Sequence, residues 1–211
     1  MKATIVYDNT SLENNLQADW GFACLVEAHG RKILFDTGAN GSILMGNMAG
    51  LGIDPMEVQE VLISHDHWDH TGGLSDFLRV NSVPVYVPGS CREPFGTSEV
   101  IKVEDSREIH EGIFSTGELK GIEQSLVLAT EKGPVVVAGC SHPGVGTILT
   151  AASQWGNVHA LIGGLHGFDE LGLLEDLKLV CPTHCTQHIS DIKKSYPGKY
   201  VQGGAGKVIE V

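Results

Sequence analysis

Three histidines and two aspartates lie within six consecutive positions, from His65 to His70. Residues 64–73 read Ser-His-Asp-His-Trp-Asp-His-Thr-Gly-Gly and directly follow the apolar run 61–63. Imidazole and carboxylate groups suit a borderline divalent cation such as Zn²⁺, Fe²⁺ or Mn²⁺. A buried apolar run does not normally lead into five ionisable groups unless a bound charge neutralises them. The segment therefore indicates a metal site rather than a histidine-rich surface stretch without metal.

The spacing within this segment indicates two adjacent metal ions. Side chains on an extended loop alternate in direction, so His65, His67 and Asp69 can converge on one point. His70 then faces a second point nearby.

Two further histidines follow buried strand-like runs, each at a corner that leads into a predicted helix. Residues 135–138 lead through Gly-Cys-Ser to His142, and the next residue, Pro143, suits the first turn of a helix. Residues 179–181 lead through Pro-Thr to His184. We predict both histidines as metal ligands; the alternative for each is a structural histidine with its hydrogen bonds satisfied.

His166 follows two glycines, Gly163 and Gly164, which let the backbone approach a ligand closely. We predict a substrate-binding or proton-transfer role for His166, with metal ligation as the alternative. His188 lies one helical turn beyond His184 and is expected to pack.

The five cysteines are an odd number without a Cys-x-x-Cys pair, so we expect reduced thiols and a cytoplasmic protein. Cys140 and Cys185 each neighbour a predicted ligand histidine. One of them could be a metal ligand. We favour the other interpretation, in which both are small buried hydrophobic side chains, because neighbours at a strand end point to opposite sides. Trp20 and Trp155 are expected to pack, and Trp68 could form a wall of the pocket.

The elements that must position these residues are short strands with helices between them. Strand patterns lie at residues 3–7, 22–28, 32–35, 58–63, 83–87, 100–103, 108–114, 125–129, 134–138, 159–162, 178–180 and 207–211. Helical patterns lie at residues 42–51, 72–78, 145–155, 170–177 and 186–196. The second half of the chain roughly repeats the plan of the first.

The acidic composition of the chain limits the kinds of partner that it can bind. The 211 residues carry 14 basic and 26 acidic side chains, a net charge of −12. Such a surface repels nucleic acids and anionic membranes. The chain shows no signal-peptide pattern and no apolar stretch near the ~18 residues that a membrane span needs. We expect a small-molecule partner, no nucleic acid and no membrane; the oligomeric state stays open.

The pattern His-x-His-x-Asp-His-Thr-Gly-Gly resembles the signature of the metallo-β-lactamase-fold hydrolases. Further segments resemble the branch named after a dihydropterin ribofuranosyl-aminobenzene phosphate synthase. In chain order these segments are 8–10, 34–38, 64–74, 123–126, 139–144, 163–166 and 182–186.

This resemblance implies an α/β fold, a four-layer αββα sandwich, as a single domain over residues 1–211. It also implies two divalent ions, Zn²⁺ first, with Fe²⁺ or Mn²⁺ as alternatives. The implied ligands are His65, His67 and His142 for one ion, and Asp69, His70 and His184 for the other. A hydroxide bridging both ions would attack the substrate. Asp36, at the end of a strand, would hydrogen-bond a ligand imidazole and fix its tautomer; the alternative is a turn residue before Thr37 and Gly38.

The sequence departs from the usual family pattern at one corner. Most members have a Gly-Asp corner whose carboxylate bridges the metals, but residues 139–142 here read Gly-Cys-Ser-His. Glu118 falls near the position of an isolated histidine in many members. Two divalent ions, balanced only by Asp69 and a hydroxide, would leave a charge of +2. This excess favours a substrate with a phosphate, carboxylate or enolate group.

Three functions fit these observations. We predict a hydrolase of a small anionic ester, lactone or phosphoester, with Asp69 and His166 as its catalytic residues. The alternative is a pterin-related transferase, as the branch name implies. A non-hydrolytic metal-binding protein fits least, because the flavin-linked di-iron relatives usually have Glu where this chain has His67.

Overall fold

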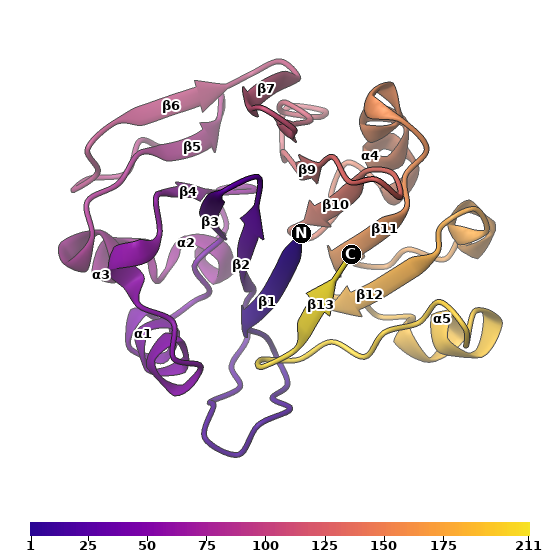
Figure 1. Ribbon diagram of the computed structural model, residues 1–211, viewed down its shortest axis with the longest axis horizontal. Coiled ribbons are helices and arrows are strands. Elements are labelled where there is room, and N and C mark those ends of the chain that lie inside the picture. The colour runs from indigo at the N-terminus through magenta and orange to yellow at the C-terminus, as the bar shows by residue number, and fades with distance from the viewer.

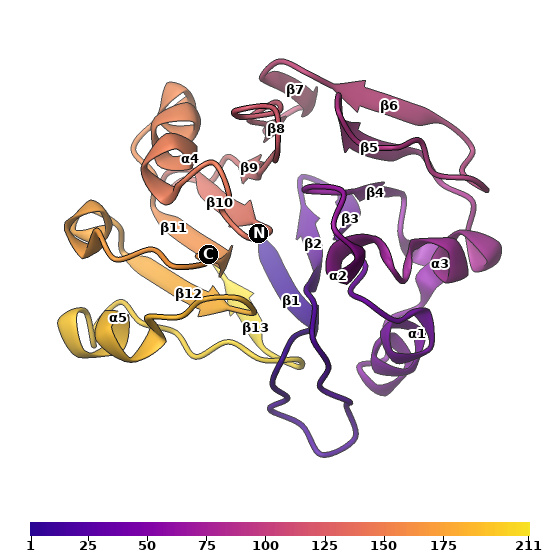
Figure 2. The ribbon, with the colours of Figure 1, turned by 180° about the vertical axis from the view of Figure 1, so that it is seen from behind.

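Two β-sheets pack face to face at the centre of the protein, and helices cover both outer faces (Figures 1 and 2). The computed structural model describes residues 1–211. Helices α1 (Gly41–Gly50), α2 (Trp68–Thr71) and α3 (Leu74–Val80) lie outside the first sheet, and α4 (Val145–Ala152) and α5 (Ile189–Ser195) outside the second. The predicted αββα sandwich is therefore confirmed.

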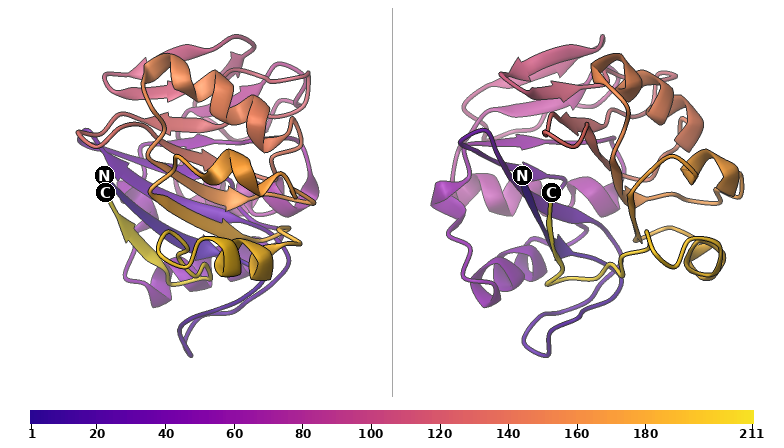
Figure 3. Two further views of the ribbon diagram at one scale, coloured as in Figure 1. Left: turned by 90° about the vertical axis from the view of Figure 1, so that its right-hand side faces the viewer. Right: turned by 45° about the vertical axis from the view of Figure 1, so that its right-hand side comes forward.

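The first sheet has seven strands in the order β13-β1-β2-β3-β4-β5-β6. Their bounds are Lys2–Tyr7 (β1), Ala23–Ala28 (β2), Arg31–Phe35 (β3), Glu60–Leu62 (β4), Val85–Pro88 (β5), Val100–Val103 (β6) and Val208–Glu210 (β13). The C-terminal strand β13 pairs antiparallel with β1, which brings the two chain ends side by side (Figure 3).

The second sheet has six strands in the order β12-β11-β10-β9-β8-β7. Their bounds are Arg107–His110 (β7), Ile113–Ser115 (β8), Leu126–Leu128 (β9), Val135–Ala138 (β10), Ala160–Gly164 (β11) and Leu179–Thr183 (β12). Short 3-10 turns at Pro55–Glu57, Ser153–Trp155 and Leu171–Leu174 complete the elements.

Parallel pairing in both sheets decides where the candidate residues meet. Strands β3 to β6 run parallel, and so do β10, β11 and β12. The carboxyl ends of parallel strands lie at one edge of a sheet, where ligands commonly bind. The predicted site residues all follow such ends: Asp36 follows β3, residues 64–70 follow β4, and His142, His166 and His184 follow β10, β11 and β12.

The apolar residues form three layers that hold this edge in place. Between the sheets, side chains such as Val26, Phe35 and Leu62 from the first sheet meet Val137 and Ile162 from the second. A second cluster lies beneath α1 and α3, and a third beneath α4. Three apolar layers between four structural layers are what an αββα sandwich requires.

Two sequence-based elements are of a different kind in the structure, and a third begins at a different residue. The single strand predicted over 108–114 is a hairpin of β7 and β8, because Gly112 turns the chain with φ +73° and donates its N–H to the Glu108 carboxylate at 3.1 Å. The helix predicted over 170–177 is only the 3-10 turn at 171–174.

The helix predicted to begin at residue 186 begins at Ile189 instead. The Thr186 hydroxyl donates to the Thr183 carbonyl at 2.7 Å and accepts the Leu165 N–H at 2.9 Å. Thr186 thereby joins the loops after β11 and β12 instead of starting a helix. The longest helix, α1, has 10 residues, so no helix reaches the length and apolarity that a bilayer crossing needs.

The inter-sheet core gives the first prediction. Phe35 is fully buried between the sheets, whereas Phe95 is 94% exposed. Phe35→Ala should lower the free energy of unfolding by about 3–5 kcal/mol, since it removes buried apolar area and leaves a cavity. Phe95→Ala should change it by less than about 0.5 kcal/mol. Denaturant unfolding of both variants checks this, and equal effects would contradict the burial of Phe35.

Candidate metal centre

The histidine loop after β4 is organised by Asp36, which is fully buried. Its Oδ1 accepts the Ser64 N–H at 2.7 Å. Its Oδ2 accepts the Ser64 hydroxyl and lies 2.7 Å from His70 Nδ1. Because a carboxylate only accepts, His70 carries its proton on Nδ1, and the Nε2 lone pair faces away from Asp36. Burial acts against protonation of His70, but Asp36 raises its pKa.

The same carboxylate sets the tautomer of His65 through Ser64. The Ser64 hydroxyl gives its hydrogen to Asp36, so it can only accept from His65 Nδ1, 2.8 Å away. His65 Nε2 is therefore left with a lone pair, and it faces His67 Nδ1 at 3.0 Å. Burial and the neighbouring histidines lower the pKa of His65, so this imidazole is neutral, the form that binds a metal.

The corner that carries His142 is organised by another buried carboxylate, Glu123. Its Oε1 accepts the N–H groups of Gly139, Cys140 and Ser141 at 3.1, 3.1 and 3.0 Å. Its Oε2 accepts the N–H of His142 at 2.9 Å. Four N–H groups converge on one carboxylate, which fixes the backbone of the whole corner. Burial raises the pKa of Glu123, although the N–H groups of His142 and Ser141 act against that shift.

His142 joins the histidine loop across the gap between the sheets. Its ring centroid lies 4.8 Å from that of His65 and 4.9 Å from that of His67. Burial, with His67 and His166 nearby, lowers its pKa to about 4. The three imidazoles predicted for one metal therefore lie together.

The loop after β12 is held by the end of β1. The buried Asp8 carboxylate accepts the His184 N–H at 2.8 Å, and burial raises the pKa of Asp8 to about 6. Asn9 Nδ2 donates to the His184 carbonyl at 2.9 Å, and Asn9 Oδ1 accepts the Gly21 N–H at 3.2 Å. The atom of Asn9 that faces His184 Nδ1 at 2.9 Å is thus an oxygen, so His184 protonates Nδ1 and leaves Nε2 with a lone pair.

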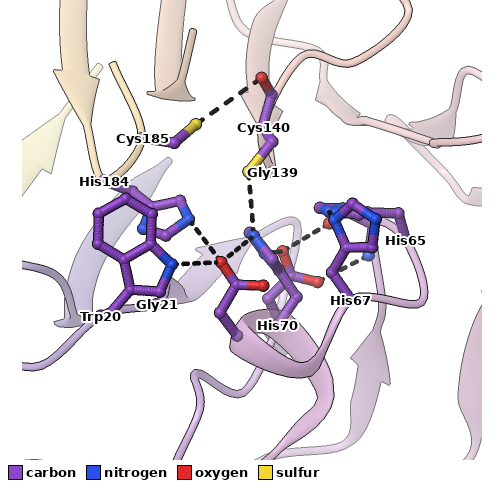
Figure 4. A network of polar contacts seen from close by, with 12 residues as sticks. Trp20, Gly21, His65, His67, His70, Gly139, Cys140, His184 and Cys185 are labelled. Carbon is purple, nitrogen blue, oxygen red and sulfur yellow. Dashed lines mark hydrogen bonds and ion pairs between the residues drawn. The ribbon is translucent and has the colours of Figure 1, made fainter. Parts of the chain in front are cut away.

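Asp69 lies between His70 and His184. Its Oδ2 is 3.2 Å from His184 Nε2 and 3.9 Å from His70 Nε2. The indole N–H of Trp20 donates to the same oxygen at 2.8 Å (Figure 4). Burial acts against ionisation of Asp69, but His184 and His70 lower its pKa. The expectation that Trp20 only packs is wrong, because its N–H orients the Asp69 carboxylate.

Cys140 also lies in the site, which corrects the expectation of a packing role. Its sulfur is 3.2 Å from His70 Nε2, and Figure 4 shows it pointing at that ring. Ligand atoms of His65, Cys140 and His142 lie within 4.8 Å of one another, and so do those of His70, Cys140 and His184. Cys185 belongs to neither group; its thiol donates to the Cys140 carbonyl at 3.9 Å.

Two buried nitrogen atoms have no hydrogen-bond partner, and they decide whether the site suits a metal. These atoms are His142 Nε2 and His184 Nε2. The contact of His184 Nε2 with Asp69 is an ion-pair distance without hydrogen-bond geometry. Buried polar atoms are normally satisfied, and an unpaired one costs about 1–3 kcal/mol. Neutral imidazoles, a carboxylate and a thiol around a shared space form a donor set that fits Zn²⁺ or Fe²⁺.

A cavity of about 480 Å³ opens beside His142. Its walls include His166, whose ring centroid is 5.2 Å from that of His142. Lys120 also lines the cavity and donates to the Pro143 carbonyl at 2.6 Å. His166 thus lies next to the ligand cluster but outside it.

Two other candidates lie away from the centre. Glu118 accepts the N–H of Ser90 at 3.2 Å and belongs to neither ligand group. His188 pairs with Asp191 at 3.1 Å on the surface of α5.

The sequence analysis assigned no role to Asn9 or Glu123, and only packing to Trp20. Asn9 and Glu123 fall in two of the segments that carry the family resemblance, and that was their only signal. The sequence contained no signal for the contact of Trp20, because its partner Asp69 lies 49 residues away in the chain.

Comparison with known proteins agrees with the fold described above. Residues 21–152 match the metallo-beta-lactamase superfamily. The chain is 24% identical, over 98% of its length and 95% of the relative's, to a 7,8-dihydropterin-6-methyl-4-(beta-D-ribofuranosyl)-aminobenzene-5'-phosphate synthase of Methanocaldococcus jannaschii.

Two solved structures extend the likeness over the whole chain. Tm1679, a metal-dependent hydrolase of the beta-lactamase superfamily, aligns with a TM-score of 0.84 and 27% identity, covering 100% of this chain and 99% of that one. The metallo-beta-lactamase fold protein YhfI of Bacillus subtilis aligns with a TM-score of 0.69, 100% and 99% coverage and 12% identity, which shows the fold alone.

The Glu123 cluster gives the second prediction. Glu123→Gln replaces one acceptor oxygen with an N–H donor that faces backbone N–H groups. We expect a loss of about 1–3 kcal/mol in the free energy of unfolding and about 10–100-fold weaker metal binding. Glu131→Gln, at an exposed position, is the control and should change neither. Urea unfolding and competition with a chelator measure both; a variant with normal metal affinity would show that the corner holds its shape without Glu123.

Proposed function

The chain belongs to the metallo-β-lactamase superfamily, and from this premise we propose that it is a metal-dependent hydrolase of a small anionic ester, lactone or phosphoester. The observation that carries the proposal is the pair of buried, unpaired nitrogen atoms, His142 Nε2 and His184 Nε2. Each lies in a group of ligand atoms close enough together to share one ion.

Two divalent ions would occupy these positions, with further ligands from the histidine loop. His65, His67 and His142 would hold one ion, and Asp69, His70 and His184 the other. Bound there, such ions would supply Lewis acidity that polarises a substrate oxygen and lowers the pKa of water toward neutrality.

The residues of the chain prepare the site for this chemistry before any substrate enters. Asp36 and Asn9 fix the imidazole tautomers so that nitrogen lone pairs, rather than N–H groups, face the shared space. Trp20 fixes the orientation of the Asp69 carboxylate by donating a hydrogen bond to one of its oxygens. A preorganised donor set binds metal more tightly, because little ordering remains to be done.

The cavity beside the site supports a small substrate. Its volume of about 480 Å³ lies in the range of small-molecule pockets, roughly 300–1,000 Å³. Lys120 contributes a cation to its wall, which also includes the exposed acids Asp169 and Glu170. His166, at the cavity wall next to His142, would exchange a proton with the substrate or hold its oxyanion.

A pterin-related transferase is the second candidate. It is favoured by the likeness to the Methanocaldococcus synthase, which extends over nearly the full length of both chains. A transferase would bind two substrates at once, whereas the cavity of about 480 Å³ beside His142 has the size of one small-molecule pocket, which fits a hydrolase better. An activity screen with phosphoesters, lactones and dihydropterins separates the two: turnover of an ester by water supports hydrolysis, and turnover only when a dihydropterin and an acceptor are both present supports transfer.

Metal content gives the third prediction. The purified protein should hold two divalent ions per chain after reconstitution. His67→Ala should lose most of one ion and Asp69→Ala most of the other, because each removes a ligand. Elemental analysis measures both, with His188→Ala as the control that keeps both ions. Wild-type protein that binds no transition metal would overturn the proposal.

The role of His166 gives the fourth prediction. His166→Ala should keep the full metal content but lower kcat/KM by about 10²–10⁴, the usual range for general acid–base groups. The pH profile of kcat/KM should also lose one limb. Loss of a metal ion instead would make His166 a ligand, and an unchanged rate would reduce it to a packing residue.

A further inference from the structure

We propose that the Cys140 thiolate is a ligand shared by both metal positions, and that it gives the centre a preference for sulfur-binding metals. The inference rests on the proposed dinuclear site and adds a ligand to it. It corrects the charge of the centre and limits which metals suit it.

The position of the sulfur carries the argument. Cys140 Sγ belongs to the group with His65 and His142 and also to the group with His70 and His184. Its distance of 3.2 Å from His70 Nε2 is close to that between two ligands of one tetrahedral ion, about 3.3–3.8 Å for bonds of about 2.0–2.3 Å. A single atom that is a member of both groups can bridge them.

More acceptor atoms lie around the sulfur than one thiol proton can satisfy, which points to a cation. Asp36 fixes the proton of His70 on Nδ1, so a lone pair on Nε2 faces the sulfur. His184 is buried, with 7% of its surface exposed, and its Nε2 has no hydrogen-bond partner. The Cys140 thiol can give its one proton to His70 Nε2 at 3.2 Å, but this leaves His184 Nε2 without a donor, whereas a cation between them can bind both nitrogens and the sulfur.

The backbone holds the sulfur in this place. Glu123 accepts the N–H groups of Gly139, Cys140 and Ser141, and Ser141 has φ +60°. A side chain at Gly139 would collide with Ser64 Oγ, so glycine is what lets this corner approach the histidine loop. The sulfur is thus positioned from both sheets.

A thiolate changes the electrostatics of the centre. Two divalent ions carry +4, and Asp69 and Cys140 together supply −2, which leaves +2 before water loses a proton and +1 afterwards. Sulfur is a soft donor that suits Zn²⁺, Fe²⁺ and Co²⁺, whereas Mn²⁺ and Mg²⁺ prefer oxygen. We therefore expect Mn²⁺ to compete poorly with Zn²⁺ in this protein.

X-ray absorption at the zinc edge of the protein loaded with two zinc ions tests the proposal. A shared thiolate gives about one sulfur neighbour per zinc, at about 2.3 Å. A value of one half would mean that Cys140 binds a single ion, and zero would mean that its thiol only donates a hydrogen bond to His70. Either result overturns the sharing but leaves the proposed function standing. Failure to bind zinc at all would overturn the proposed function itself.

Three variants test whether Cys140 is the source of the sulfur signal. Cys140→Ser should abolish the sulfur signal and weaken zinc binding at least tenfold, with circular dichroism confirming that the variant is folded. Cys185→Ser, the matched control, should keep the signal. Cys140→Asp should hold two ions again without the signal and bind Mn²⁺ at least tenfold better, relative to Zn²⁺, than the wild type does. A signal that persists in Cys140→Ser or vanishes in Cys185→Ser would overturn the assignment, as would unchanged metal preference in Cys140→Asp.

Discussion

The hydrogen bonds accepted by the Asp36 carboxylate determine how the rest of the centre is built. One oxygen takes the Ser64 hydroxyl and the His70 imidazole, and the other takes the Ser64 N–H. Through these contacts Asp36 sets the tautomer of His70 directly and that of His65 through Ser64. Without this fixed set of protons, N–H groups could face the shared space, and a cation could not bind there.

Each of the three loops that supply candidate ligands is held by a buried carboxylate. Asp36 holds the histidine loop, Glu123 holds the corner at 139–142, and Asp8 holds the loop of His184. All three accept backbone N–H groups that no strand or helix satisfies. Buried N–H groups need such partners, and ionised acceptors form the stronger hydrogen bonds. The acidic composition of the protein therefore includes side chains that shape its interior, and a large negative charge is compatible with an anionic substrate.

The two sheets contribute different parts of the centre. The first sheet provides the loop with His65, His67, Asp69 and His70, and the second provides Cys140, His142, His166 and His184. The centre can form only where the carboxyl ends of β4, β10 and β12 meet, so the inter-sheet core and the site depend on each other. Metal bound between the sheets would add a cross-link to that core, because a ligand that binds only the folded state stabilises it.

The sequence by itself determined the family, the sandwich fold and the residues of the histidine loop. The members of this six-residue motif must lie close together in space, because only a few residues of backbone separate them. Strand patterns placed His142 and His184 at strand ends, and parallel pairing brought them to the same edge. The tertiary structure alone decided the places of Cys140, Trp20, Asn9 and Glu123. Trp20 meets Asp69 across 49 residues, and Asn9 meets His184 across 175. The direction of the Cys140 sulfur depends on a turn that Glu123 holds from outside the segment. Contacts of this kind leave no periodicity in the chain, because they are fixed by the pairing and packing of strands that lie far apart in the sequence.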